Sequence, residues 1–392
     1  MLKRSLIREL LDSVSEYGIV KVLGARQVGK TSLIRSCFTD KPYYSLEDPL
    51  TRMQIERDPL GFRHKLQQEA GAILDEVQCL PVVEEWVKEI ANQHPQPGQF
   101  ILLSSIVPLN QDTSTFDGGN SPLEKRLFLW SLAYEEYEAT PNLVQALWQG
   151  SMPLLQQHDG SISRDGFYAD YLQTYLERDI RALVNLKDIR RFQRFLLLMA
   201  ERIGQVANHS TVAKAIGVSS TTIQHWVKAL QASFLLIELP AFSSNIHKRV
   251  VKSSKYYFSD TGLAAFLLGL QSAEALWQSP WRQSFYENLM ILELLKTYWH
   301  QGINPSLAFY RDSQGHEVEL LIQHPQGILP VAIRLADSFQ TEFVAGIEQF
   351  RKASKDWVPD AVVLYNGEAN YTINNTRILN LWQTNSPDNS AN

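Results

Sequence analysis

A complete G-x-x-x-x-G-K-[ST] pattern near the amino end constrains the fold of this chain more than any other feature. An apolar run at 19–23 precedes the pattern and a helical segment follows it, which is the strand–loop–helix context that a phosphate-binding loop requires. Glycines let the backbone N–H groups of such a loop point at phosphate oxygens, and the new helix offers its positive end to the same anion. The residues expected to bind nucleotide phosphates are Gly24, Ala25, Arg26, Gln27, Val28, Gly29, Lys30, Thr31 and Ser32.

A second motif lies about 45 residues further on, where the short apolar segment 72–74 ends in Asp75 and Glu76. We expect Thr31 and Asp75 to hold Mg²⁺, Lys30 to reach the β- and γ-phosphates, and Glu76 to orient the attacking water. Taken separately, the first motif could be a glycine turn before a surface helix and the second a solvated strand end. Together they predict a site for a nucleoside triphosphate.

Composition places the chain among ordinary globular proteins, and its 392 residues suffice for two or three domains. The net charge of −5 means that any surface for nucleic acid must be a local patch. Two cysteines, Cys37 and Cys79, make neither a disulfide framework nor a metal cluster, which suits a reducing compartment. The charged amino-terminal helix is not typical of a signal peptide, and the apolar runs are too short to span a bilayer. We therefore expect a cytoplasmic protein without a membrane segment.

Hydrophobic periodicity predicts an α/β protein with several regions. Residues 1–140 show alternating strands and helices, typical of a parallel sheet with helices on both faces. The regions expected after it are a helical connector at 141–191, a winged helix-turn-helix at 192–258, a second α/β region at 259–382 and a disordered tail at 383–392. The strands expected in the second α/β region are 307–311, 318–323, 329–335 and 361–365, and the helices are 261–269 and 283–299.

Two segments have alternative interpretations. The helix-turn-helix could bind duplex DNA, although its second helix, 221–231, carries few basic residues. The stretch 247–255 is more basic and would be the wing, with His247, Lys248, Arg249, Lys252 and Lys255. A protein partner, or a role as a rigid spacer, is an equal alternative to DNA. The charged and aromatic cluster at 175–180 is typical of a packed helix with solvated charges.

The sequence resembles bacterial and archaeal AAA-type ATPases that carry a C-terminal domain of unknown function, and the resemblance covers nearly the whole chain. It implies ATP as the nucleotide, and it implies that the C-terminal region has a restriction-endonuclease-like fold. The segments that carry the resemblance are 24–31, with its Arg-Gln pair, 45–49, 58–59, 74–78, 175–180, 255–263 and 287–288.

The chain departs from the family pattern after the third strand and again before 127. Ser104-Ser105 stands where the family has Gly-Ser; a polar residue here could face the γ-phosphate or could simply end a strand. Leu123 to Arg126 stands where the family has Leu-Ala-Gly-Arg. Arg126 keeps the guanidinium, so we expect it at the γ-phosphate of the same subunit or of a neighbouring one, which would make the protein an oligomer. A surface arginine is the equal alternative.

The family's nuclease-like domain uses an acidic residue and a Glu-x-Lys pair to hold Mg²⁺ and the scissile phosphate. Glu287 and Glu319 could take the acidic positions, but the Glu-x-Lys position is Ala332-Ile333-Arg334. Alanine cannot bind a metal, so we predict an inactive nuclease-like domain. The function expected is a Mg²⁺-dependent ATPase that switches a DNA or protein partner. The alternatives are a DNA-processing ATPase–nuclease and a scaffold that binds nucleotide without hydrolysing it.

Overall fold

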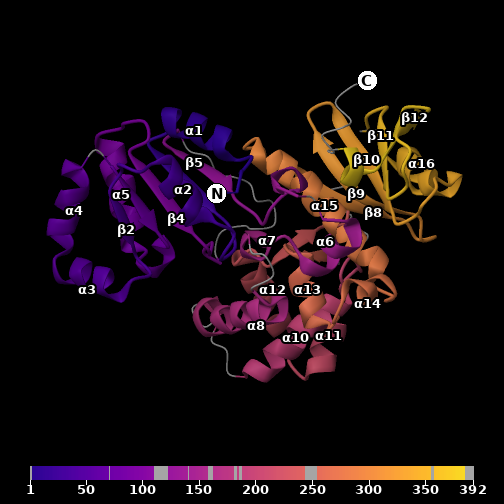
Figure 1. The fold of residues 1–392 in the computed structure, drawn as a ribbon, viewed down its shortest axis with the longest axis horizontal. Coiled ribbons are helices and arrows are strands. Elements are labelled where there is room, and N and C mark those ends of the chain that lie inside the picture. The colour runs from indigo at the N-terminus through magenta and orange to yellow at the C-terminus, as the bar shows by residue number, and fades with distance from the viewer. Residues whose placement is uncertain are drawn as a thin grey trace.

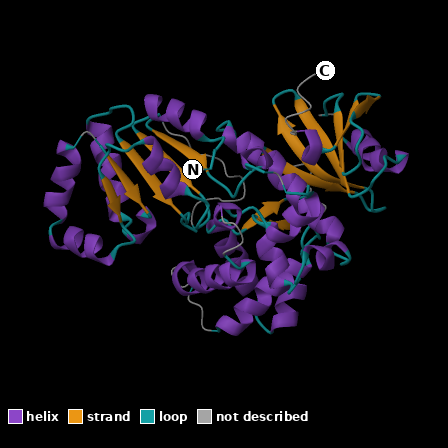
Figure 2. Cartoon of the chain, in the orientation of Figure 1, coloured by secondary structure: helices purple, strands orange, loops and turns teal. Residues whose placement is uncertain are grey.

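The computed structural model describes residues 2–69, 71–109, 122–139, 141–157, 162–180, 183–184, 188–242, 254–354 and 357–384. A parallel sheet formed by the first third of the chain lies at one end of the elongated molecule, and a second sheet from the last quarter lies at the other (Figure 1). Between them lie helices and a short pair of strands (Figure 2). No helix within the described ranges is long and apolar enough to cross a bilayer.

The first sheet has five parallel strands in the order β2-β3-β4-β1-β5. Its strands are β1 (Ile19–Leu23), β2 (Tyr43–Ser45), β3 (Ala72–Asp75), β4 (Phe100–Ser104) and β5 (Glu124–Phe128). Its helices are α1 (Ile7–Glu16), α2 (Lys30–Cys37), α3 (Pro49–Arg57), α4 (Pro59–Gln68) and α5 (Val82–Gln93), with the short turn η1 (Val77–Cys79). This confirms the predicted α/β class.

Both faces of the first sheet are covered, because apolar side chains leave its strands on both sides. One face packs Val20 and Ile101 with α1 and α2, and the other packs Leu74 and Leu102 with α3, α4 and α5. All five strands run in one direction, so their carboxyl ends meet at one edge, where β4 separates β1 from β3. The phosphate loop after β1 and the carboxylates after β3 are therefore brought to the same edge.

Helices and a small antiparallel sheet follow. These are η2 (Tyr134–Glu136), α6 (Leu143–Gln149), α7 (Pro153–Gln157), α8 (Arg164–Thr174), the π-helix η3 (Tyr175–Ile180), α10 (Ile189–Glu201), α11 (His209–Ile216), α12 (Ser220–Ala232), β6 (Leu236–Leu239) and β7 (Lys255–Phe258). Gly217 ends α11 with a φ of 78°, and the Ser219 hydroxyl caps α12 by accepting from Thr222 N–H. Two helices therefore form around the glycine-containing turn that the sequence predicted.

The last region contains a six-stranded mixed sheet in the order β12-β13-β11-β10-β9-β8. Its strands are β8 (Ser306–Arg311), β9 (Glu317–His324), β10 (Gly327–Arg334), β11 (Ala361–Tyr365), β12 (Tyr371–Ile373) and β13 (Thr376–Leu379). The helices of this part are α13 (Thr261–Leu267), α14 (Ala273–Trp277), α15 (Arg282–His300), η4 (Thr341–Val344), α16 (Ala345–Ala353) and α17 (Leu381–Thr384). The four predicted strands and two predicted helices are confirmed, whereas no pattern in the sequence indicates the short strands β12 and β13.

The regions share one hydrophobic core, which extends from Leu6 to Trp382. Helix α15 runs between the two large sheets (Figure 1), and its Trp299 stacks on Trp130 with ring centroids 4.5 Å apart. Helix α17 includes residues 383 and 384, which the sequence assigned to a disordered tail, a difference within the usual margin at helix ends. Residues 385–392 of that predicted tail lie outside the described residues.

Candidate nucleotide-binding site

The loop between β1 and α2 has the backbone geometry of a phosphate cradle. At Gly24 a Cβ atom would lie 2.0 Å from the carbonyl oxygen of Leu129, so only glycine allows the neighbouring segment to approach. Gly29 has a φ of 94° and precedes the first residue of α2, where the N–H groups of a new helix are unpaired. The sequence prediction of a strand–loop–helix at this position is therefore confirmed.

Lys30 points back into this loop. Its Nζ donates to the carbonyl oxygens of Gly24 and Ala25 at 2.8 and 2.9 Å, and the side chain is buried. Burial lowers the pKa of Lys30, although the nearby carboxylates of Glu76 and Asp75 oppose that effect. A buried ammonium held by two neutral carbonyls has much to gain from an anion, so phosphate oxygens would compete well for it.

Thr31 and Asp75 meet at the carboxyl edge of the sheet. Thr31 Oγ1 donates to Asp75 Oδ2 at 2.6 Å, and the Tyr43 hydroxyl donates to the same oxygen at 2.7 Å. The other carboxylate oxygen, Oδ1, is buried and has no hydrogen-bond partner among the described residues. A buried oxygen without a partner, next to a threonine hydroxyl, suits Mg²⁺, which takes few protein ligands and completes its shell with water and phosphate.

Glu76 follows Asp75 in a left-handed conformation, with a φ of 56°, which turns its carboxylate toward the end of β4. Ser105 Oγ donates to Glu76 Oε2 at 2.6 Å, and the Gln78 side-chain amide donates to the same oxygen. Burial alone would raise the pKa of Glu76, but the Lys30 charge and these hydrogen bonds hold that pKa below its ordinary value. Glu76 is therefore ionised at neutral pH, as a residue that accepts a hydrogen bond from water must be.

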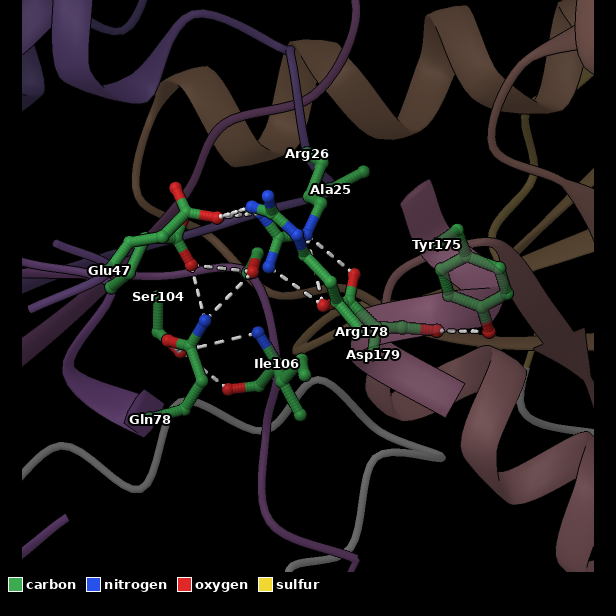
Figure 3. A network of polar contacts seen from close by, with 12 residues as sticks. Ala25, Arg26, Glu47, Gln78, Ser104, Ile106, Tyr175, Arg178 and Asp179 are labelled. Carbon is green, nitrogen blue, oxygen red and sulfur yellow. Dashed lines mark hydrogen bonds and ion pairs between the residues drawn. The ribbon is translucent and has the colours of Figure 1, made fainter. Parts of the chain in front are cut away.

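Gln78 and Ser104 extend this network to the end of β4 (Figure 3). Ser104 Oγ lies 2.7 Å from Gln78 Oε1 and 2.6 Å from the carbonyl oxygen of Ile106, and it accepts from Ile106 N–H. The serine pair is thus more than a plain strand end, because Ser105 contacts Glu76 directly. A contact between this pair and the γ-phosphate stays a prediction.

A cavity of about 310 Å³ opens beside the phosphate loop. Arg4 lines it and was not anticipated: its Nη1 donates to Val28 O at 2.7 Å and its Nη2 to Trp130 O at 2.6 Å. Arg4 also pairs with Glu136 at 3.2 Å. No motif marks Arg4 in the sequence, because its partners are carbonyl groups distant along the chain. The other lining residues include Gln27, Gly29, Lys30, Thr31, Ser32 and Glu76.

Arg26 was expected to bind phosphate, but in this structure its guanidinium binds two carboxylates (Figure 3). Its Nε and Nη2 donate to Asp179 at distances of 2.7 to 2.9 Å, and its Nη1 donates to Glu47 at 3.0 Å. Glu47 also pairs with Arg178. The segment 175–180 is therefore more than a packed helix with solvated charges, since it brings the buried Asp179 to the phosphate loop.

Arg126 lies apart from these residues. It is on β5, where its Nε contacts Glu124 at 3.0 Å, and it lines a separate small hollow with Lys21 and Ser104. It is not among the described residues that line the cavity beside Lys30 and Thr31. This placement gives no support to a contact with the γ-phosphate of the same subunit, and a role in a neighbouring subunit stays a prediction.

The predicted basic wing needs one correction. Lys255 is only 2% exposed at the start of β7, where its Nζ donates to Glu287 at 3.0 Å and pairs with Glu317. It cannot contact DNA, because the polar cluster below the strand holds its charge. The remaining basic residues of the wing, 247–252, lie outside the described residues.

The acidic residues expected in the C-terminal region do come together. Glu287 also accepts from the Tyr257 hydroxyl at 2.5 Å, while Glu319 pairs with Arg334 and accepts from Ile333 N–H at 3.0 Å. Ala332 is buried in the core of the sheet. Two cations of the chain itself, Lys255 and Arg334, thus neutralise the carboxylates. In the described part of the chain, no group of three or more acidic, histidine or cysteine residues could hold a metal ion.

Three segments of the chain match families of known proteins. Residues 16–137 match a family described as an AAA domain, and residues 140–274 and 282–384 match two families described as domains of unknown function, DUF8612 and DUF4143. The uncharacterized proteins Rv2008c of Mycobacterium tuberculosis and Mb2031c of Mycobacterium bovis are each 26% identical to the chain over 330 residues, which are 82% of this chain and 71% of the relative.

A solved structure, the Walker-type ATPase PABY2304 of Pyrococcus abyssi, is similar with a TM-score of 0.45 and 15% identity, over 68% of this chain and 96% of that one. The AAA match covers the five-stranded parallel sheet, the phosphate loop and both carboxylates after β3. Residues 16–137 together with this site thus support an AAA-type P-loop ATPase.

Proposed function

We propose that the protein binds ATP with Mg²⁺ and hydrolyses it by in-line attack of water on the γ-phosphate. The observation that carries the proposal is the convergence of four side chains, Lys30, Thr31, Asp75 and Glu76, at one edge of the sheet. Lys30 and Glu76 line one cavity with the phosphate loop. The buried, unbonded Oδ1 of Asp75 adds the position that a cation would fill.

Each of these side chains has a distinct role in the proposed reaction. Lys30 exchanges its two carbonyl partners for phosphate oxygens, which neutralises charge that builds up as the bond to the leaving group breaks. Thr31 and Asp75 would hold Mg²⁺, which would neutralise negative charge on the phosphates of the nucleotide. Glu76, ionised and fixed by Ser105 and Gln78, accepts a hydrogen bond from the attacking water and orients it.

We further propose that nucleotide turnover switches a partner bound to the region around α12. Three helices followed by a two-stranded antiparallel sheet, in the order α10, α11, α12, β6, β7, support a winged helix there. The exposed side chains on one face of α12 are Thr221, Gln224, His225 and Lys228. They suit duplex DNA or a polar protein surface.

The two alternative functions have less support. A DNA-processing nuclease needs a metal at the C-terminal carboxylates, but Lys255 and Arg334 already pair with them. Glu76 has a strained, left-handed conformation, and two hydrogen-bond donors contact its carboxylate. A scaffold that never hydrolyses nucleotide would not require this arrangement.

The test is steady-state ATP hydrolysis with Mg²⁺ by the purified chain, with and without duplex DNA, beside Lys30→Ala. We expect turnover that the substitution abolishes together with ATP binding; an unchanged ATP affinity in Lys30→Ala would refute the assignment of the site. Turnover that rises with DNA identifies DNA as the partner, and turnover indifferent to DNA indicates a protein. Tight ATP binding without any turnover would replace the ATPase with the scaffold.

A further inference from the structure

The π-helix η3 contacts the phosphate loop near one end and the residue that follows α12 at the other. Near its carboxyl end, Asp179 accepts hydrogen bonds from Nε and Nη2 of Arg26 in the phosphate loop. At its amino end, the Tyr175 hydroxyl lies 2.8 Å from Ser233 Oγ, in the residue that follows α12. Three residues therefore separate a contact to the nucleotide site from a contact at the end of the proposed partner-binding helix.

The contact between Arg26 and Asp179 is a two-pronged, charge-assisted pair, the strongest kind of side-chain contact in proteins. Asp179 is only 3% exposed, so it would be costly to leave this carboxylate without its arginine. Burial raises the pKa of Asp179 while Arg26 opposes the rise, so the carboxylate depends on Arg26 to stay charged. Any movement of Arg26 toward a bound triphosphate must therefore move Asp179 or break the pair.

A second set of contacts connects Glu76 with the carboxyl end of α12. Ser105 contacts Glu76, and two residues later Val107 N–H donates to Ala232 O, the last residue of α12, at 2.8 Å. Next to it, Phe234 packs edge-on against Trp130, with centroids 5.7 Å apart. Both sides of the nucleotide site are thus attached to the carboxyl end of α12.

A cleft of about 710 Å³ lies against α12. Leu109, two residues beyond Val107, and Val184, whose N–H bonds to Ile180 of η3, line it on one side. Thr222, His225 and Lys228 of α12 are also part of its lining. The surface on which a partner would bind is therefore formed partly by segments that continue from the nucleotide site.

We propose that Asp179 is a positioning residue for ATP hydrolysis: it holds Arg26 and, through η3, couples nucleotide occupancy to α12. A triphosphate brings several negative charges into the loop, and these compete with Asp179 and Glu47 for the guanidinium of Arg26. A π-helix differs from an α-helix by one residue in hydrogen-bond register, so η3 can take up such a displacement within one turn. This inference rests on the proposed ATPase function.

The experiment compares Asp179→Asn with Asp170→Asn, the same substitution at an exposed position of α8. Binding of Mg²⁺ with AMPPNP, steady-state turnover, and hydrogen–deuterium exchange of residues 220–236 are measured for each. In the wild type and in Asp170→Asn, we expect AMPPNP to slow exchange in this segment. Asp179→Asn is expected to keep its AMPPNP affinity, to lose the exchange response, and to turn over ATP about tenfold more slowly or worse.

Tyr175→Phe separates coupling from hydrolysis and from misfolding. It removes one hydroxyl and leaves Ser233 bonded to Ala229 O, so turnover stays near wild type while the exchange response shrinks. If Asp179→Asn matches Asp170→Asn in both turnover and exchange, Asp179 is not a positioning residue. If the wild type binds AMPPNP and residues 220–236 do not respond, the coupling is refuted and the ATPase stands. If the wild type does not bind AMPPNP, both proposals fall.

Discussion

Thr31 and Asp75 lie 44 residues apart in sequence, and their side chains are joined by a hydrogen bond of 2.6 Å between Oγ1 and Oδ2. The parallel sheet makes this possible, because β1 and β3 end at the same edge although β4 lies between them. The Thr31 hydroxyl in the first turn of α2 and the carboxylate at the end of β3 are thus brought together. One carboxylate oxygen remains available there for a cation.

Thr31→Ala tests this pair as the Mg²⁺ site. Loss of the hydroxyl removes one ligand, and we expect the Mg²⁺ concentration for half-maximal hydrolysis to rise by about tenfold or more, the usual size of such an effect on metal affinity. A Mg²⁺ titration at saturating ATP measures it. Thr39→Ala, in an exposed loop, is the matched control; the same Mg²⁺ dependence in both variants would contradict the assignment.

Ser105→Ala tests how the charge of Glu76 is maintained. The Ser105 hydroxyl favours the ionised carboxylate and so lowers the pKa of Glu76. Without the hydroxyl that pKa rises, and the acid limb of the kcat profile moves to higher pH. Profiles of kcat against pH for this variant and for Ser15→Ala, an exposed control, show the difference. An acid limb that stays in place, or moves to lower pH, would refute the role of Ser105.

Lys255→Met tests the buried charge cluster of the C-terminal region. Removing the ammonium leaves Glu287 and Glu317 without their shared cation, and such a loss usually costs about 3–5 kcal/mol of unfolding free energy. Thermal and denaturant unfolding measure it, with the exposed Lys352→Met as the control. If Lys255 were instead a solvent-exposed wing residue, the two variants would unfold alike and only DNA binding would differ.

The parts of the site that are contiguous in the chain could be predicted from the sequence. The phosphate loop and the Asp75–Glu76 pair are local motifs, and the strands that carry them are long enough to show their apolar pattern. Arg4 and Tyr43 could not be found in this way, because no motif marks them and their partners are distant along the chain. The contact of Asp179 with Arg26 could not be found either, although the segment 175–180 stands out in the sequence.

One expectation failed because it relied on neighbours in sequence. Lys255 closes a basic stretch, yet it begins a strand whose burial turns it toward Glu287. Arg126 lies in a basic pair, and strand β5 places it beside Glu124 in its own subunit, while a role in a neighbouring subunit stays a prediction. The composition of a segment shows how much charge it carries. The alternation of side chains along the strand and the packing on its buried face determine which of the charged side chains are buried.

The central claim is that Glu76 orients the water that attacks ATP, and the most direct measurement is phosphate release from Mg²⁺–ATP by wild type and by Glu76→Gln. The substitution keeps the size of the side chain and removes its charge. We predict unchanged ATP affinity and turnover reduced by about 100-fold or more, as expected for loss of a general base. Turnover equal to that of the wild type would contradict the account.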